Sequence, residues 1–550
     1  DHYMDYEELT CQLQQFQQRY PRWMRLHSLA QTPQGRSVWG VEVTDLESGE
    51  PDEKPAIHLD GNTHAGEVTG SMAVMYLLDL LLSNHDDPQI HFLLQHYTFT
   101  LIPRISPDGA EVYLKTPATL RSVDRPGRTE TVQGIVKDDL DHDGVIRMMR
   151  IPDPCGAWKQ DEQDPRLMVR RQPDELEGRF YTLMPEGRVV GSKHQPLKAA
   201  QSKWNLDFNR NYPSWWKPDQ PGAGEYPLDN PETRAVADFL IQHPGIGVMI
   251  TCHTSGGQIL NPPGPWSESE HDAVQDIRIY HQIGQIGTQE TGYPLLNLFD
   301  GFHCTHQDYA AGAGDDWAYL NRGIFAVTVE LWDMLSRAGL SMEEITAQQC
   351  DESQRRQQQF KALAWIDQHC PQSWKPWTPF SHPQLGEVEI GGLDSKFVVQ
   401  NCPPSFLRQE CEKTARFALR LCRFLPRLVI ESLSCEPLGD GFYRVEAVIA
   451  NHGYLPTTIS EQKRKLRLSQ PIEIRLEGFT VLQPQKELRW EGLDGFGQDQ
   501  TWWSMSGCGG SSAQVRQHVQ WIGQGKPGDM LTLFCRCAHA GHDRRTLILK

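Results

Sequence analysis

Hydrophobic positions in the first 425 residues form short apolar runs that alternate with stretches of helical spacing. Residues 6–20 repeat apolar side chains with the period of a helix, and residues 24–29 and 37–43 are typical of strands. Further strand-like runs occur at 56–59, 97–102, 247–252 and 324–331, with a helix expected at about 67–82. Strands that alternate with helices predict an α/β domain, built on a mostly parallel mixed sheet flanked by helices.

The pattern changes after about residue 425. Short apolar runs with strand-like alternation follow at 427–430, 442–449, 472–476 and 530–534, and Gly, Pro and Asn turns separate them. This arrangement is typical of an all-β sandwich of immunoglobulin-like type. We therefore expect an α/β domain over residues 1–425, followed by a β-sandwich domain over residues 426–550.

Composition agrees with a soluble globular protein of two or three domains. The 550 residues exceed what one core normally serves, and 38% are hydrophobic and 23% charged. No run of 18 apolar residues occurs, so no transmembrane helix is predicted. The 53 basic and 71 acidic residues give a net charge of −18, which argues against nucleic acid as a partner.

The cysteines and the first residues bear on the compartment. Thirteen cysteines lie at irregular spacing without a Cys-x-x-Cys pair, which is typical of reduced thiols rather than a disulfide framework. The opening residues Asp1-His2-Tyr3-Met4 do not resemble a signal peptide. We expect a cytoplasmic protein, or a secreted one if a signal peptide has been removed.

Candidate chemistry begins with His64-Ala65-Gly66-Glu67 and with His253, which ends an apolar strand. A histidine and a carboxylate three residues apart can bind one metal, and His253 adds a second nitrogen. Two nitrogens and one oxygen leave the fourth position of a tetrahedral zinc ion open for water, as in catalytic zinc sites. Glu330 lies among Val327, Val329 and Leu331 on another apolar strand, where it is a candidate base for that water.

Five blocks of sequence, in this order, resemble the zinc metallocarboxypeptidases of the funnelin type, the family of carboxypeptidases A and B. They are Asp60–Glu67, Pro103–Gly109, Asn205–Tyr212, Ile250–Thr254 and Tyr309–Leu331. The resemblance extends over roughly residues 1–425. It implies a zinc-dependent carboxypeptidase that acts on the C-termini of peptides or proteins, with one zinc ion held by His64, Glu67 and His253 and with Glu330 as the base.

The resemblance also implies roles for five further residues. Arg121, which follows Asp108 by 13 residues, corresponds to the arginine that stabilises the transition state, although Arg125 and Arg128 compete for that role. Asn209 and Arg210 correspond to the residues that bind the free C-terminal carboxylate, and Tyr309 to the tyrosine that closes over the terminal residue. Asp315 resembles the pocket acid that selects C-terminal Lys or Arg, in a segment one residue shorter than the family's.

Residues 122–204 have only a short counterpart in the family and are rich in Arg, Asp, Pro and Gly, so we interpret them as an insertion at the rim of the site. Within them, Asp139, Asp141, Asp143 and Gly144 match the first half of an EF-hand calcium loop, but Arg150 stands where a bidentate Glu is needed. Two interpretations remain: a Ca²⁺ site completed by other carboxylates, or an acidic turn.

Other functions compete with the carboxypeptidase interpretation. An acyl-amino-acid hydrolase or a hydrolase of peptidoglycan peptides would use the same zinc ligands and differ in its specificity residues. A non-catalytic binding protein with this fold would usually have lost a ligand or the base. Because His64, Glu67, His253 and Glu330 are all present, the binding-protein alternative is disfavoured.

Overall fold

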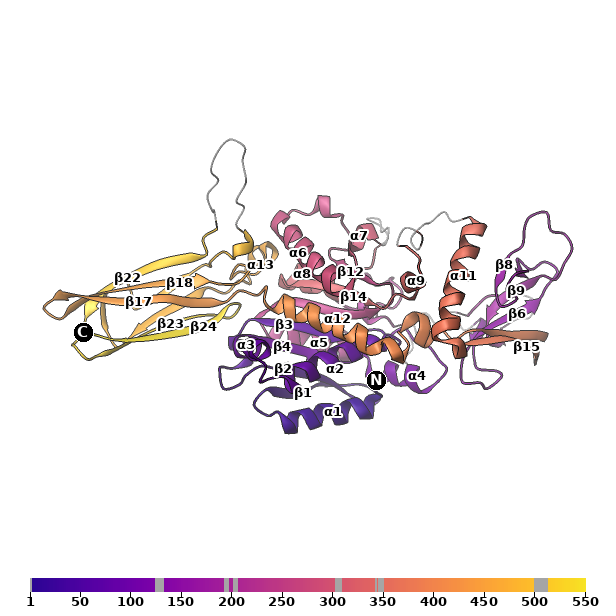
Figure 1. The fold of residues 1–550 in the computed structure, drawn as a ribbon, viewed down its shortest axis with the longest axis horizontal. Coiled ribbons are helices and arrows are strands. Elements are labelled where there is room, and N and C mark those ends of the chain that lie inside the picture. The colour runs from indigo at the N-terminus through magenta and orange to yellow at the C-terminus, as the bar shows by residue number, and fades with distance from the viewer. Residues whose placement is uncertain are drawn as a thin grey trace.

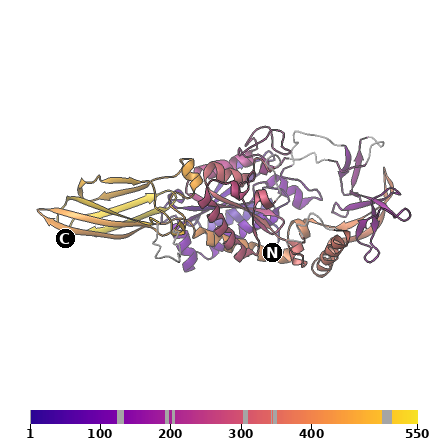
Figure 2. The ribbon, with the colours of Figure 1, turned by 90° about the horizontal axis from the view of Figure 1, so that it is seen from above.

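The computed structural model describes residues 2–123, 133–191, 197–200, 206–301, 309–341, 344, 351–498 and 513–550. The molecule is elongated, with three parts in succession along its longest axis (Figure 1). A β-sandwich forms one end, an α/β domain the middle, and a small sheet with helix α11 (Glu352–His369) the other end. The same succession is visible from above (Figure 2).

The central domain is built on an eight-stranded mixed sheet. The pairs β3–β4, β3–β11, β11–β14 and β12–β13 are parallel, whereas β1–β2, β2–β4 and β12–β14 are antiparallel. In spatial order the strands are β1 (Met24–Gln31), β2 (Ser37–Val43), β4 (Thr98–Ile102), β3 (Ala56–Gly61), β11 (Ile246–Thr254), β14 (Phe325–Leu331), β12 (Gln258–Asn261) and β13 (Leu295–Asn297).

Helices cover both faces of this sheet. On one face α2 (Val68–Ser83) and α12 (Pro404–Cys422) share a core with Val248 and Ile250 of β11. On the other face α5 (Pro231–Gln242) and α8 (Gly314–Arg322) pack with Met249 of the same strand. Because β11 has helices on both sides, all nine of its residues are buried, as expected for a central strand of an α/β sheet.

The remaining helices of the central domain surround these layers. Asp5 and Glu8 form a capping box at the start of α1 (Tyr6–Arg19), which explains why this helix begins where it does. The others are α3 (Pro88–His96), α4 (Pro107–Lys115), α6 (Val274–Thr291), α7 (Leu298–Gly301) and α9 (Met334–Arg337).

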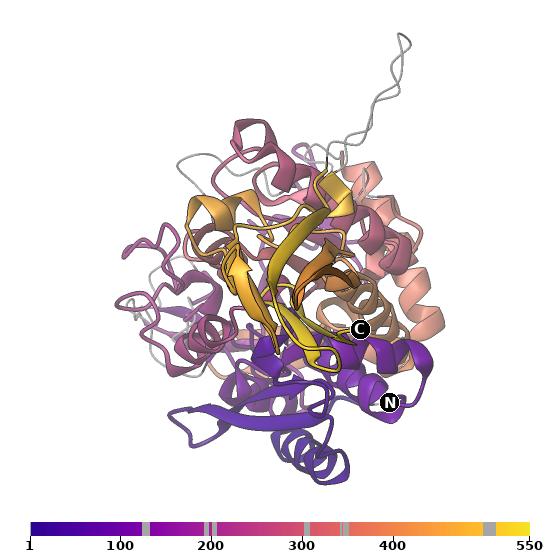
Figure 3. The same ribbon diagram turned by 90° about the vertical axis from the view of Figure 1, so that its left-hand side faces the viewer.

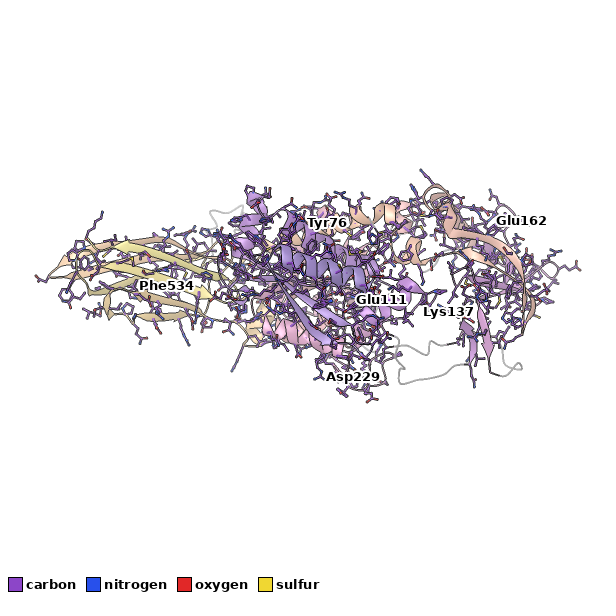
Figure 4. The ribbon with its side chains drawn as sticks, turned by 90° about the horizontal axis from the view of Figure 1, so that it is seen from below. Tyr76, Glu111, Lys137, Glu162, Asp229 and Phe534 are labelled. Atoms are coloured by element: carbon purple, nitrogen blue, oxygen red, sulfur yellow. The ribbon has the colours of Figure 1, made fainter. Side chains whose placement is uncertain are left out.

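The expected insertion forms a sheet together with a later part of the chain. Strand β16 pairs antiparallel with β6 of the insertion, placing Ile390 opposite Met149. Lys137 and Glu162 are labelled in this part of the molecule (Figure 4). The sheet consists of β15 (Trp374–His382), β16 (Gly386–Leu393), β6 (Met148–Pro152), β9 (Tyr181–Pro185), β7 (Trp158–Gln160) and β8 (Met168–Arg170), beside a two-stranded sheet of β5 (Gly134–Lys137) and β10 (Gly187–Val190).

The C-terminal part consists of two antiparallel four-stranded sheets, seen end-on in Figure 3. Alternate residues of both sheets, among them Val445, Trp521 and Leu533, enclose a separate core. One sheet contains β17 (Leu428–Gly439), β18 (Phe442–Asn451), β22 (Arg516–Gln524) and β20 (Thr480–Gln483). The other contains β21 (Glu487–Trp490), β19 (Ile472–Glu477), β23 (Met530–Cys537) and β24 (Gly541–Ile548).

The predicted fold class is therefore confirmed: a mixed α/β sheet flanked by helices, followed by an all-antiparallel β domain. Within the described ranges, no helix has both the length and the apolar character needed to cross a membrane. The short helix α13 (Glu461–Lys465) lies where the sandwich meets the central domain, with the Ser460 hydroxyl donating to the Gly323 carbonyl.

Candidate metal centre and active site

The three predicted metal ligands lie together at the carboxyl ends of adjacent parallel strands. His64 and Glu67 stand in the loop between β3 and α2, and His253 is the eighth residue of β11. All three side chains are buried. The carboxyl ends of parallel strands are where α/β sheets place their ligands, and the pairing of β3 with β11 brings the two segments together across 189 residues.

The donor atoms of these residues converge. His64 Nδ1 lies 2.8 Å from Glu67 Oε1, His253 Nδ1 lies 2.9 Å from Glu67 Oε2, and the two Nδ1 atoms are 3.1 Å apart. Zinc bonds of roughly 2.0–2.2 Å place tetrahedral ligand atoms about 3.4 Å from one another, which is close to these separations. Glu67 Oε2 is also buried, and beyond its ion-pair contact with His253 it has no hydrogen bond. The donor set and this orphaned oxygen fit a zinc ion.

The electrostatics of the cluster also favour a cation. Burial alone would raise the pKa of Glu67, but the imidazoles of His64 and His253 hold that pKa below its usual range. Burial opposes charge on His253 as well, yet the Glu67 carboxylate raises the pKa of His253 to about 9. Without a metal, the cluster therefore retains a proton, and metal binding would release it.

Asp207 joins this cluster to Arg121 and was not among the predicted site residues. Its Oδ1 lies 3.1 Å from His64 Nε2, and its Oδ2 accepts a hydrogen bond from Arg121 Nε at 2.8 Å. A carboxylate behind a ligating imidazole fixes the ring and raises the basicity of its other nitrogen. The only signal in the sequence is an acidic residue two positions before Asn209.

Glu330 lies beside the metal cluster because β14 pairs with β11. In the parallel register His253 is opposite Glu330, so both side chains lie at the same end of the sheet. Burial and the negative charge of Glu67 raise the pKa of Glu330 to about 7. A carboxylate with a pKa near neutrality is suited to accept and return a proton.

One cavity of about 340 Å³ brings the predicted residues together. Its lining includes His64, Arg121, Asn209, Arg210, His253, Tyr309, Asp315 and Glu330. Arg121 is partly exposed and its Nη1 lies 3.8 Å from Glu67 Oε1, next to the ligand set. The competing residues Arg125 and Arg128 lie outside the described residues, as does Asn205.

Asn209 and Arg210 are held in a 3-10 turn (Phe208–Arg210) that is hydrogen-bonded to the loop before α8. Asn209 Oδ1 accepts from the backbone N–H of Gly314 at 2.8 Å, and the N–H of Tyr212 donates to the Gly312 carbonyl at 3.0 Å. The same loop carries Tyr309, whose ring lies 4.0 Å from Lys217 Nζ. These bonds place the two polar side chains and Tyr309 on one wall of the cavity.

Asp315 lies deep in this wall and is 3% exposed. Its Oδ2 accepts from the Thr328 hydroxyl at 2.8 Å and its Oδ1 from the Asp316 N–H at 2.9 Å. Each carboxylate oxygen keeps a lone pair for another donor. A buried carboxylate lining a cavity with apolar Leu260 and Leu298 suits a cationic group on an aliphatic stem.

The calcium prediction gains no support from the structure. Lys375 Nζ lies 2.6 Å from Asp141 Oδ2 and 2.8 Å from Asp143 Oδ2, and Arg147 also pairs with Asp143. Asp139 instead accepts the backbone N–H groups of Asp143 and Gly144. Side-chain cations and backbone donors occupy the oxygens of these three carboxylates except Asp141 Oδ1, which is buried without a hydrogen bond. One oxygen each of Asp139, Asp141 and Glu186 lie within 4.8 Å of one another. Because Lys375 already supplies a positive charge at Asp141 and Asp143, the segment is better described as an acidic turn closed by Lys375. Lys375 belongs to β15, which the sequence did not link to this loop.

Comparison with protein families gives two matches. Residues 10–349 match the family model described as zinc carboxypeptidase, and residues 427–548 match one described as a domain of unknown function. Carboxypeptidase D of Anas platyrhynchos is 30% identical over 354 residues, covering 59% of this chain and 19% of that protein. Carboxypeptidase D of Homo sapiens is 28% identical over 111 residues, covering 20% of this chain and 8% of that protein.

The matched region thus spans much less than two thirds of these relatives' own length. Among solved structures, thrombin activatable fibrinolysis inhibitor aligns over 76% of this chain and 75% of its own, with 16% identity and a TM-score of 0.42. Carboxypeptidase A from Helicoverpa armigera aligns over 66% and 72%, with 16% identity and a TM-score of 0.41. The zinc carboxypeptidase family model by itself matches residues 10–349, which is more than half of the chain. The chain therefore belongs to the zinc carboxypeptidase family.

Proposed function

We propose that this chain is a zinc-dependent metallocarboxypeptidase that releases C-terminal amino acids from peptides. The observation that carries the proposal is the single cavity in which His64, His253 and Glu330 face Asn209 and Arg210. The first group can hydrolyse an amide, and the second can bind a carboxylate. A single cavity with both properties is suited to the last peptide bond of a chain.

His64, Glu67 and His253 would hold the zinc ion, which supplies Lewis acidity that acidifies water and polarises the peptide carbonyl. Glu330 accepts the proton of the attacking water and then delivers it to the nitrogen of the leaving amino acid. Its position opposite His253 in the sheet puts the carboxylate beside the ligand set. Asp207 keeps His64 oriented throughout.

Arg121 and Arg210 serve different charges in the proposed reaction. Arg121, next to the ligand set, stabilises the negative charge that develops on the carbonyl oxygen. Arg210, with Asn209, binds the free carboxylate of the terminal residue, for which a guanidinium is geometrically suited. Tyr309 then covers that residue, and Asp315 receives its side chain.

Substrate amidation separates this proposal from an endopeptidase. Arg210→Ala should reduce kcat/KM for free-acid peptides by roughly 30-fold or more. The reason is that a bound carboxylate that loses its cationic hydrogen-bond partner costs on the order of 2–5 kcal/mol. The unmodified enzyme should cleave C-terminally amidated peptides poorly, and Arg210→Ala should not worsen that rate.

Arg234→Ala is a matched control, because this exposed arginine donates to the Leu228 carbonyl and does not line the cavity. It should leave kcat/KM for free-acid peptides unchanged. Equal cleavage of amidated and free-acid peptides by the unmodified enzyme would contradict the carboxypeptidase assignment, even if zinc were bound.

A further inference from the structure

Helix α2 begins directly after Glu67, one of the three predicted metal ligands, and this residue does not cap the helix. Glu67 occupies the N-cap position of α2, but its side chain makes no capping hydrogen bond. Its carboxylate faces His64 and His253 instead. The first N–H groups of a helix lack partners within the helix, so another group must accept from them.

Asn401 supplies that acceptor from a distant part of the chain. Its side chain is fully buried, and Oδ1 accepts from the Thr69 backbone N–H at 2.9 Å and from the Thr69 hydroxyl at 3.0 Å. At the other end of the same amide, Nδ2 donates to the Gly66 carbonyl at 2.6 Å. One side chain thus holds the residue before Glu67 and the second residue after it.

The amide of Asn401 is itself fixed by its surroundings. Nδ2 also lies 3.1 Å from the Tyr113 hydroxyl and 3.1 Å from the Lys396 carbonyl, and that hydroxyl donates to the same carbonyl at 3.0 Å. The contact on Gly66 is tight, since an added Cβ would lie 2.6 Å from Gln400 Nε2 and 2.7 Å from the Tyr113 ring. The loop from His64 to Glu67 therefore has little freedom to move.

We propose that Asn401 is a positioning residue for the metal centre: it caps α2 in place of Glu67 and so leaves the Glu67 carboxylate available as a ligand. The inference rests on the proposed zinc site. Without Asn401, the Thr69 N–H would compete for the Glu67 carboxylate, and the Gly66 carbonyl would lose its buried donor. Groups that orient metal ligands typically change metal affinity 10–100-fold when removed.

The test compares Asn401→Ala with Asn451→Ala. Asn451 is also buried and bonds in the same manner, with Nδ2 donating to the Leu455 and Asp494 carbonyls and Oδ1 accepting from the Arg427 and Gly453 N–H groups. Both variants should lower the melting temperature of the metal-free protein. Only Asn401→Ala should weaken zinc binding, by 10-fold or more, measured by competition with a chromophoric chelator.

Tyr113→Phe provides a milder variant if Asn401→Ala does not fold. It removes only the hydroxyl beside the Asn401 amide and should weaken zinc binding about threefold, as expected for one hydrogen bond. An unmodified protein that binds no zinc would overturn the proposed function together with this inference. Zinc binding at full affinity in Asn401→Ala, or in Tyr113→Phe if only that variant folds, would overturn the inference and leave the proposed function intact.

Discussion

Glu330 is the residue whose proposed role depends most directly on its surroundings. It lies on β14 opposite His253, in a site where burial and Glu67 raise its pKa to about 7. Glu330→Gln preserves the shape of the side chain but removes the proton acceptor. We expect kcat to fall by at least about 100-fold, with zinc content unchanged by metal analysis.

The zinc content serves as the control, because Glu330 is not among the three residues whose donor atoms converge. If kcat of Glu330→Gln stayed near that of the unmodified enzyme, another group would have to activate the water. Loss of zinc from this variant would instead assign Glu330 a structural role.

Asp315 should decide which C-terminal residue is released. Its buried carboxylate lines the cavity and is bonded by Thr328 and by the Asp316 N–H, without a cationic side chain at hydrogen-bond distance among the described residues. Asp315→Ala should lower kcat/KM for peptides ending in Lys or Arg at least about 30-fold, as for other buried charge pairs that lose one partner. Peptides ending in Leu or Phe should be affected much less, and an equal loss on both would argue against selection by charge.

At the scale of elements, the metal site depends on the close approach of α2 to β11. A Cβ added to Gly70 would lie only 2.4 Å from the backbone carbonyl oxygen of Cys252, the residue before His253. Gly70→Ala should therefore lower the free energy of unfolding by about 1–3 kcal/mol, although alanine favours helix. Chemical denaturation would measure the change, with Asp79→Ala on the exposed side of α2 as a control expected within about 0.5 kcal/mol.

The six-stranded sheet that the insertion forms with β15 and β16 combines elements that are far apart in the sequence. Residues 374–393 form the hairpin β15–β16, and its second strand pairs with β6 of the insertion. Lys375 on that hairpin neutralises Asp141 and Asp143. The acidic loop that suggested a calcium site therefore already has a cation, which comes from β15, the outer strand of this hairpin.

At the scale of the molecule, the junction between the central domain and the sandwich contains a buried lysine. Lys463 of α13 is 4% exposed, and its Nζ lies 3.4 Å from the Ile246 carbonyl oxygen. Burial, and to a smaller extent repulsion from Arg322, lowers the pKa of Lys463 to about 7. The other titratable groups near Lys463 are Cys537 and His539. The folded protein thus releases this proton more readily than the unfolded chain does.

The pH dependence follows from that difference. Between about pH 7 and the ordinary lysine value of 10.5 the unfolded state binds more protons, so stability from this group rises with pH. Below pH 7 the cost of burying the charge is fully present. Lys463→Met should raise the free energy of unfolding at pH 7 by about 1–4 kcal/mol and reduce its rise towards pH 9.

Calorimetry at several pH values would measure this, with Lys465→Met as the control. Lys465 pairs with Asp272 at 2.8 Å on the surface and should change stability by less than about 1 kcal/mol. A Lys463→Met protein that was less stable at pH 7 would show that the ammonium makes a net favourable contact at the junction.

The sequence by itself determined the order of elements and the identity of the chemical groups. Apolar runs located β2 at residues 37–43 and α2 within one residue of its observed start, because local periodicity and burial agree in regular elements. His64, Glu67, His253 and Glu330 could be named because their residue types and strand-end positions carry chemical meaning without coordinates. The all-β character of the C-terminal part was equally visible in its alternating pattern.

Only the tertiary structure decided which distant groups meet. Asp207 behind His64, Asn401 at the start of α2 and Lys375 beside the acidic loop all act across more than 100 residues of sequence. A single polar residue in a loop has no periodicity that would predict its partner, since its energy comes from a hydrogen bond formed after folding. Strand register and helix packing set these contacts, and neither is encoded in the local pattern of hydrophobic and polar residues.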